Sequence, residues 1–340
     1  MTSLSVPTPF LWRRFHSLTG IWITLFLIEH LLVNSQAGLF FGEGGLGFIH
    51  SVNGIKNLPY LSLIELTLLG IPFLSHMILG IQILFTSKIN SYGDTGKDPY
   101  LPEYGRNRAY TWQRWTSWFL LFAILFHVIQ MRFWEAPVAA DTLTDQGVQT
   151  HYLIPVKKDL GLPTVAARLG VTLLDAEAIK AKKERFKQGT PVADPQGFSF
   201  QHIYTALQGI FSPSVPPVKQ ELSLAVQKTQ IEEKWLLSLS SVHLGKDEVL
   251  AISPSFGTAE LLLVRETFKN PLMIAFYSLF VLTAVFHAFN GLWTFLITWG
   301  VTLSEKSQRA SLKLAQGLMV LVAFLGLIAV WGTYLVNLRY

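Results

Sequence analysis

The sequence of 340 residues contains no cysteine. This absence excludes disulfides, a covalently attached c-type haem and any iron–sulfur cluster held by thiolates of this chain. A redox centre in this protein would therefore need ligands other than cysteine.

Charged residues are also scarce, at 14% of the chain, whereas 50% of the residues are hydrophobic and the mean hydropathy is +0.38. Together with 10 Trp and 24 Phe, this composition indicates a membrane protein. Segments long enough to cross a hydrocarbon core of about 30 Å are expected at residues 15–35, 61–86, 115–134, 271–299 and 313–338. The first lacks a small-residue cleavage site, so we interpret it as a retained helix and not as a signal peptide.

The basic residues around these spans predict the orientation of the chain. One side of the membrane would carry Arg13, Arg14, Lys88, Lys97, Arg106, Arg108, Arg114, Lys306, Arg309 and Lys313. The other side would carry only Lys56, Arg132 and Arg339. Because basic residues are retained in the cytoplasm, we expect a cytoplasmic N-terminus and an external C-terminus. The basic residues serve topology and a docking partner, and no feature of the sequence indicates nucleic acid.

A polar segment interrupts the spans and predicts three parts: residues 1–135 with three spans, an insertion at 136–270, and residues 271–340 with two more spans. The insertion has as many acidic as basic side chains, and it includes the helix-like stretch LLDAEAIKAKKERFKQ. Since an unstructured loop of that length is unusual, we expect a small α or α/β domain outside the cytoplasm. The membrane-spanning part is expected to be all-α.

Each of the first four predicted spans carries one histidine among apolar residues: His30, His76, His127 and His287. His30 and His127 lie four and five residues from the outer ends of their spans, roughly 6–8 Å at about 1.5 Å per residue. His76 and His287 each lie 17 residues from the same side, roughly 26 Å. Two imidazoles at one level of a helix bundle are what a six-coordinate b-type haem requires.

Histidines also occur in membrane helices without haem. A single one is often a hydrogen-bonding residue between helices or part of a proton path. A structural zinc would need four ligands close together, which two separated pairs do not supply. A further pattern, with two stacked haems between two helices, would need histidine pairs like His16 and His30 on both helices, and only the first span has such a pair.

Two glycines agree with haem at the inner level. Gly80 and Gly291 each follow an inner histidine by four residues, on the same helix face, where a flat macrocycle could approach the backbone. Ordinary small-residue packing between helices is the alternative, and the recurrence at both histidines favours haem. His16 and Ser17, beside two arginines at the cytoplasmic end, are candidates for contact with a haem propionate or a quinone.

Several motifs together resemble a known family. They are RRFHSLTG, FLIEHLLVN, PFLSHMILG, the QRW of TWQRW leading to FHV, and FHAFNGLWTFLITWGVTLSEKSQR. These stretches look like the five-helix, di-haem cytochrome b membrane subunit of succinate:quinone oxidoreductases, an arrangement shared with quinol:fumarate reductases. The resemblance covers roughly residues 8–135 and 270–338; the long insertion departs from it.

The resemblance implies two b-type haems in a bacterial inner membrane. His30 and His127 would ligate the iron of the distal haem, near the outer face, and His76 and His287 that of the proximal haem. A flavoprotein subunit with FAD and an iron–sulfur subunit would dock on the cytoplasmic rim, with the succinate site on the partner. Electrons would pass through the haems to a quinone, often menaquinone, and the net direction of catalysis stays open.

Quinone chemistry exchanges protons, so nearby carboxylates or histidines are candidates for proton transfer. Glu29 and Glu65 are the acidic residues inside the predicted spans, both near outer ends, and His50 lies in the loop between them. A glutamate so close to the interface can also simply reach water. Two other functions stay open: a cytochrome b subunit of a formate dehydrogenase or nitrate reductase, and a haem-free transporter with histidines as proton relays.

Overall fold

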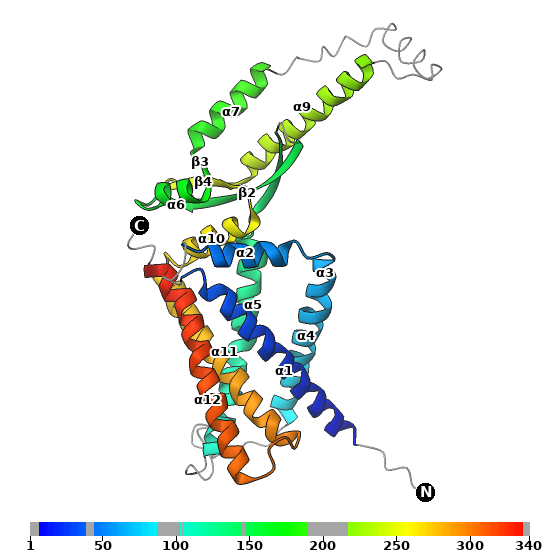
Figure 1. Ribbon diagram of the computed structural model, residues 1–340, viewed down its shortest axis with the longest axis vertical. Coiled ribbons are helices and arrows are strands. Elements are labelled where there is room, and N and C mark those ends of the chain that lie inside the picture. The colour runs from blue at the N-terminus through cyan, green and yellow to red at the C-terminus, as the bar shows by residue number, and fades with distance from the viewer. Residues whose placement is uncertain are drawn as a thin grey trace, which may run out of the picture. The chain divides into compact units, whose positions relative to one another are not determined.

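The computed structural model describes residues 7–38, 44–86, 103, 105–144, 147–189 and 217–335 (Figure 1). The chain divides into two compact units. One unit comprises Met1–Ala136 and Val264–Arg339, and the other comprises Pro137–Leu263.

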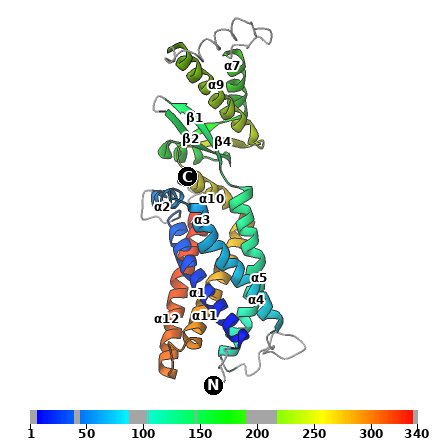
Figure 2. The same cartoon turned by 90° about the vertical axis from the view of Figure 1, so that its right-hand side faces the viewer.

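The first unit contains five helices that are long and apolar enough to cross a membrane, counted within the described residues (Figure 2). The first is α1 (Thr8–Ser35), and the second runs through α3 (Leu61–Ile64), the π-helical η1 (Glu65–Gly70) and α4 (Ile71–Thr86). The others are α5 (Gly105–Ile129) with η2 (Gln130–Trp134), α11 (Pro271–Thr298), and α12 (Glu305–Leu327) with η3 (Ile328–Gly332). A short helix, α2 (Leu46–Lys56), follows α1.

Three of these helices start seven to ten residues before the spans predicted from hydropathy, at Thr8, Gly105 and Glu305. Hydropathy marks the part of a helix that faces lipid, whereas backbone hydrogen bonding continues through the polar ends. The start of α12 is set by a capping box, in which Ser304 and Ser307 bond each other's backbone amides. At the start of α11, the Asn270 side chain accepts a hydrogen bond from the amide of Leu272.

Helix α11 packs against α1, α5 and α12. Its buried residues recur every three or four positions, as one stripe: Ile274, Tyr277, Val281, Val285, Phe289 and Trp293. Gly326 lets α12 come close, because a Cβ there would lie 2.6 Å from Val281 and 3.1 Å from Leu31. Such small-residue contacts are how membrane helices approach one another. The opposite faces expose apolar side chains on every helix, among them Leu25, Ile78, Phe122, Leu279 and Phe324, as a lipid environment requires.

The second unit, the insertion, contains a four-stranded antiparallel sheet in the order β1-β2-β4-β3. Its strands are β1 (Val138–Thr144), β2 (Gly147–Lys157), β3 (Thr172–Leu174) and β4 (Glu248–Ser253). Its helices are α6 (Leu162–Leu169), α7 (Ala176–Gly189), α9 (Pro217–Ser241) and α10 (Phe256–Thr267), which continues across the boundary of the unit. The membrane-spanning part is all-α, as predicted, and the insertion, predicted as a small α or α/β domain, contains both helices and an antiparallel sheet.

Both faces of the sheet carry a core, because successive strand residues point to opposite sides. Ile154 and Ala251 pack with residues of α6 and α10 on one face, and Leu153 and Leu250 pack with residues of α7 and α9 on the other. Strands buried on both faces are short continuous apolar runs without alternation, such as VLAIS in β4, and these are easily mistaken for helix segments.

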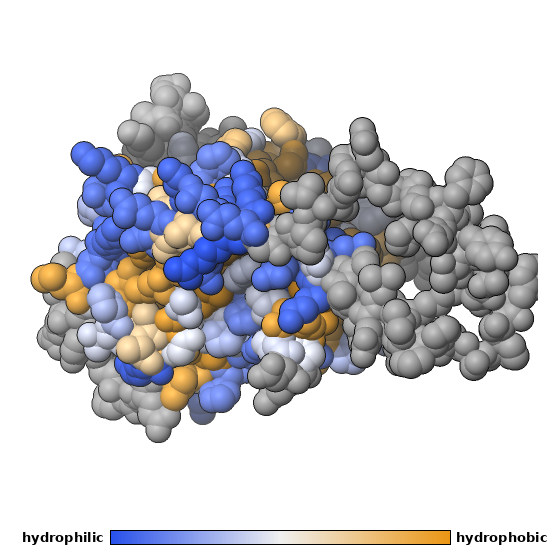
Figure 3. All heavy atoms as spheres, turned by 90° about the horizontal axis from the view of Figure 1, so that it is seen from above, coloured by the Kyte–Doolittle hydropathy of each residue, from blue (hydrophilic) through white to orange (hydrophobic). Residues whose placement is uncertain are grey.

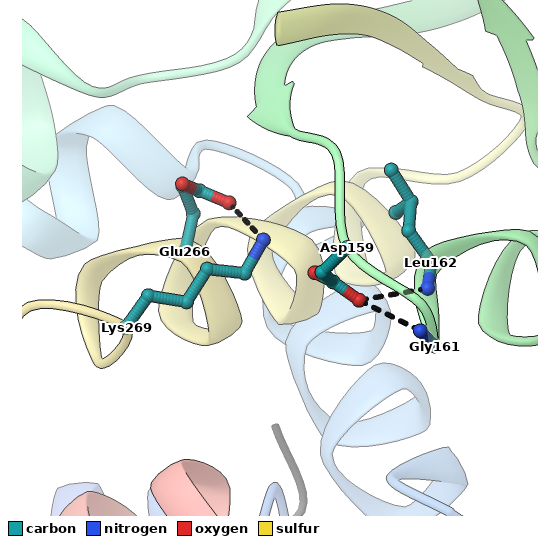
Figure 4. A network of polar contacts seen from close by, with 5 residues as sticks. All are labelled: Asp159, Gly161, Leu162, Glu266 and Lys269. Carbon is teal, nitrogen blue, oxygen red and sulfur yellow. Dashed lines mark hydrogen bonds and ion pairs between the residues drawn. The ribbon is translucent and has the colours of Figure 1, made fainter. Parts of the chain in front are cut away.

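Polar contacts fix the turns around this sheet. The Asp159 carboxylate accepts hydrogen bonds from the amides of Gly161 and Leu162, each 2.9 Å long, at the start of α6 (Figure 4). At the end of α10, Lys269 pairs with Glu266 at 2.7 Å (Figure 4). Figure 3 shows hydrophilic and hydrophobic residues side by side on the face that it draws.

Candidate functional site

The structure brings the four membrane histidines together as two pairs. His30 on α1 and His127 on α5 have ring centroids 6.0 Å apart, with an angle of 76° between the ring planes. His76 on α4 and His287 on α11 have ring centroids 6.4 Å apart, at an angle of 83°. These are the same pairs that helix depth predicts.

The spacing within each pair matches a metal held between two imidazoles. Metal–nitrogen bonds of about 2 Å, with each nitrogen roughly 1 Å from its ring centre, place two ring centres roughly 6 Å apart. Within the described ranges, no group of three or more His, Asp or Glu side chains is arranged to hold a metal ion. Two ligands are sufficient for a haem, because the porphyrin supplies four nitrogens of its own.

Hydrogen bonds at Nδ1 orient His76 and His287. Nδ1 of His76 lies 3.1 Å from the carbonyl oxygen of His16 and 3.3 Å from Oγ1 of Thr19. Nδ1 of His287 lies 3.2 Å from Oγ1 of Thr116. With Nδ1 engaged by the protein, Nε2 is the nitrogen left to bind a metal, which is the usual arrangement of metal-ligating histidines.

The outer histidines have Nδ1 contacts as well. Nδ1 of His127 lies 3.1 Å from the hydroxyl of Tyr277. Nδ1 of His30 lies 3.5 Å from Nδ2 of Asn34, which also donates to the carbonyl of His30 at 2.8 Å. Thr19, Asn34, Thr116 and Tyr277 are thus residues of the site that sequence reasoning missed, since their roles depend on how the helices face one another.

A polar network fixes α5 against α11 beside His287. Asn290 donates to Oε1 of Gln113 at 2.7 Å, and Nε2 of Gln113 donates to the carbonyl of His287 at 3.1 Å. Gln113 belongs to the QRW stretch and Asn290 to FHAFNG. Two of the motifs that carry the family resemblance are therefore joined in space, where they hold the backbone of an inner histidine.

Helices α1 and α4 cross through two reciprocal histidine–glycine contacts. A Cβ at Gly80 would meet Cε1 of His16 at 3.4 Å, and a Cβ at Gly20 would meet Cε1 of His76 at only 2.9 Å. The rings of His16 and His76 stack, with centroids 3.9 Å apart and planes 16° apart. Gly80 thus has a packing role between helices that needs no haem. Gly20 was missed, although it follows His16 by four residues, the same spacing that drew attention to the other glycines.

Gly291, the second glycine predicted to face haem, has more room. A Cβ there would meet only Nε2 of Gln113, at 3.9 Å. A haem edge beside Gly291 stays a prediction.

Near its N-terminus, α1 is bound to the C-terminal end of α11. The indole of Trp299 donates to Oγ of Ser17 at 3.2 Å, and the Arg14 guanidinium donates to the carbonyl of Thr298. Nδ1 of His16 is buried and has no hydrogen-bond partner within the described chain. A group that accepts or donates a hydrogen bond there, such as a haem propionate, would satisfy this atom. The predicted contacts of His16 and Ser17 with a propionate or quinone stay predictions.

The three residues predicted for proton transfer are not joined to one another. Glu65 forms an ion pair with Arg132 at 2.8 Å, whereas Glu29 on α1 and His50 on α2 are exposed. Between these three, as far as the structure describes the chain, no hydrogen bond or ion pair is present. Glu65 and Arg132 both lie in π-helical segments, which are frequent at functional sites.

The comparisons with known proteins agree with this architecture. No protein-family model matches the chain, and no solved structure matches it significantly. It is 21% identical over 324 residues to the succinate dehydrogenase cytochrome b558 subunit of Bacillus subtilis (strain 168), and the match covers 95% of this chain and 96% of that protein. The chain is thus a distant full-length homologue of a succinate dehydrogenase cytochrome b subunit, with five candidate membrane helices.

Proposed function

We propose that the chain is the membrane-anchor cytochrome b subunit of a succinate:quinone oxidoreductase. The observation that carries this proposal is that four histidines form two pairs, and that the rings of each pair are spaced for a metal between them. The chain that holds them is related over its full length to such a subunit. The succinate site would lie on a partner chain.

The residues of the two pairs fit b-type haems. His30 and His127 would hold the distal haem and His76 and His287 the proximal one, each through Nε2. When bound, the haems supply one-electron transfer between the iron–sulfur subunit and a quinone. The protein engages Nδ1 of His76, His127 and His287 and surrounds the rings with apolar helix faces, and such hydrogen bonds and burial are among the means by which a protein sets a haem potential.

The partners proposed for the chain are a flavoprotein subunit with FAD and an iron–sulfur subunit, docked on the inner rim. Support comes from the basic residues at the inner ends of the helices. Arg106 on α5 is exposed, bonds Gln308 of α12 and lies over the ring of Trp293, 5.6 Å from its centre. Arg14 holds α1 to α11 in a similar way. A rim of cations fixed by backbone and aromatic contacts is suited to bind an acidic partner surface.

The proposed location is a bacterial inner membrane, with the N-terminus in the cytoplasm and the C-terminus and insertion outside. The quinone, proposed to be menaquinone, would react at the outer end, where Glu29, Glu65 and His50 are the proposed proton-transfer residues. The charge bias around the spans supports the orientation. Oxidation of succinate and reduction of fumarate use the same parts, and the proposal takes the former direction.

Absorption spectra and haem quantitation of the complex purified from its native membrane would test this function. We expect a dithionite-reduced spectrum with b-type bands, two haems per chain, and partial reduction of that haem by succinate. Alanine at His30 or His127 should remove the outer haem, and alanine at His76 or His287 the inner one.

A matched control is His243→Ala, which removes an exposed histidine of the insertion and should leave both haems in place. Absence of haem from the wild-type complex would refute the proposal and favour a haem-free transporter. The complex could also contain two haems that succinate does not reduce and fumarate does not oxidise. If formate reduced those haems, or nitrate oxidised them, the chain would belong to another respiratory complex.

A further inference from the structure

A buried chain of hydrogen bonds leads from His127 to a carboxylate. Nδ1 of His127 lies 3.1 Å from the hydroxyl of Tyr277, and that hydroxyl donates to Oε1 of Gln130 at 3.0 Å. Nε2 of Gln130 donates to Oε1 of Glu135 at 2.8 Å. Thr267 donates to the other carboxylate oxygen, Oε2, at 3.0 Å. These hydrogen bonds thus connect His127, a proposed haem ligand, with the carboxylate of Glu135, eight residues further along the sequence.

The direction of every bond in this chain is the same. The hydroxyl proton of Tyr277 is directed to Gln130, so the oxygen of Tyr277 accepts a hydrogen bond from Nδ1 of His127. The carboxylate of Glu135 only accepts, and both of its oxygens are engaged. Each donor therefore points from His127 toward the negative charge, an arrangement in which successive hydrogen bonds polarise and strengthen one another.

The groups between His127 and Glu135 are buried, and Glu135 itself is partly buried. Gln130 is 2% exposed, Tyr277 5% and Thr267 6%. The ring of Tyr277 is packed edge-on against Phe268 and Phe276, with centroids 5.5 and 5.2 Å away. Electrostatic effects are stronger in such an apolar setting than in water. The charge of Glu135 can therefore act on His127 through the intervening groups.

The other three proposed haem ligands have different Nδ1 partners. Nδ1 of His76 faces a backbone carbonyl and a threonine hydroxyl. Nδ1 of His287 faces Thr116, whose hydroxyl donates to the backbone carbonyl of Gln113 at 3.0 Å. Nδ1 of His30 faces the amide of Asn34. In all three cases the nearest partners are neutral, whereas the contacts of His127 end at a carboxylate.

We propose that Tyr277, Gln130 and Glu135 are positioning residues that set the reduction potential of the outer haem. By drawing the Nδ1 proton of His127 toward a carboxylate, they increase the negative character of that imidazole. A more electron-rich ligand stabilises the oxidised iron, and the potential of the outer haem is lowered relative to the same site without the chain. This inference rests on the proposed function, since it requires that His127 ligates haem.

Two substitutions interrupt this series of hydrogen bonds at opposite ends. Glu135→Gln preserves the size of the side chain and removes its charge, and Tyr277→Phe removes the one hydroxyl that joins Gln130 to His127. Redox titration of the purified complex, followed by the b-type absorption bands, would give both haem potentials. The outer haem is identified as the one absent from His30→Ala.

Both substitutions should raise the potential of the outer haem and leave that of the inner haem unchanged. We expect up to a tenfold shift of its reduction equilibrium, which is about 59 mV for one electron. The double variant should shift the potential no further than Tyr277→Phe alone, because the chain is already cut at its first bond.

Thr116→Val is the matched control, because it removes the hydroxyl that faces Nδ1 of His287 and should affect only the inner haem. If Tyr277→Phe fails to retain the outer haem, Glu135→Gln decides the question alone. Two haems with an unchanged outer potential in Glu135→Gln would overturn the inference and leave the proposed function intact. No haem in the wild-type complex would overturn both.

Discussion

Alanine at Gly20 is expected to weaken the inner haem site without touching a ligand. A Cβ there would lie 2.9 Å from Cε1 and 3.4 Å from Nδ1 of His76. Ordinary contacts between carbon atoms are about 3.5–4.0 Å, so the ring has to move by roughly 0.6 Å or more. It is not free to move, because its Nδ1 already bonds the carbonyl of His16 and its ring stacks on the ring of His16.

The size of the effect follows from the cost of overpacking a close contact. Extra atoms in a packed interior typically cost about 1–3 kcal/mol. If that cost falls on the arrangement in which His76 and His287 face each other, affinity for a group held between them falls roughly 5- to 150-fold. The outer pair is on other parts of the helices and should be unaffected.

Haem quantitation and redox difference spectra of the Gly20→Ala complex would measure this loss. The expected result is depletion or a shifted potential of the inner haem, with the outer haem retained. Gly317→Ala is the control, since that glycine of α12 has no side chain or foreign backbone within 4 Å, and alanine there is a better helix former. Gly20→Ala with two normal haems would refute the idea that this close approach holds His76 in place.

Three further predictions concern other parts of the chain. Glu29→Gln and Glu65→Gln should each lower quinone reductase activity while haem content stays normal, and wild-type rates in both would end their proposed role in proton transfer. At Gly80 and Gly291 a Cβ would lie 3.4 and 3.9 Å from the nearest side chains, so the protein has room for alanine. Loss of haem from Gly80→Ala or Gly291→Ala would therefore indicate that haem itself lies against the glycine. Unchanged haem content would indicate that the glycine serves helix packing alone. Leu250→Ala, at a position with 0% exposure, should cost about 2–5 kcal/mol of the insertion's stability, measurable as earlier proteolysis of the insertion on heating with both haems retained.

The sequence was sufficient to predict which histidines lie at the same level of the helices, because a helix advances by a fixed distance per residue. Depth alone pairs His30 with His127 and His76 with His287, and the ring distances agree. It does not reveal which way each side chain faces around its helix. The contact of Tyr277 with Gln130 joins positions 147 residues apart, and only the packed helices bring them together.

The positions of the strands in the insertion were not predicted, for a related reason. Strand β4 is buried on both faces, so its apolar run has neither the alternation of a half-buried strand nor the period of a helix. Gly20, in contrast, was within reach of sequence reasoning. A histidine followed four residues later by glycine occurs at His16, His76 and His287, and the first instance places Gly20 beside His76.

The ends of the insertion explain how a helix bundle can accommodate it. Glu135 stands at the end of η2 and Thr267 at the end of α10, and the hydrogen bond between them joins the two places where the chain leaves and re-enters the helical unit. A domain whose ends lie together can be inserted without separating the elements on either side. The same hydrogen bond engages the second oxygen of the Glu135 carboxylate, whose first oxygen ends the series of hydrogen bonds from His127. Glu135 therefore both joins the two ends of the insertion and belongs to the residues that we propose set the potential of the outer haem, so loss of its charge should alter that potential while both histidine pairs stay intact.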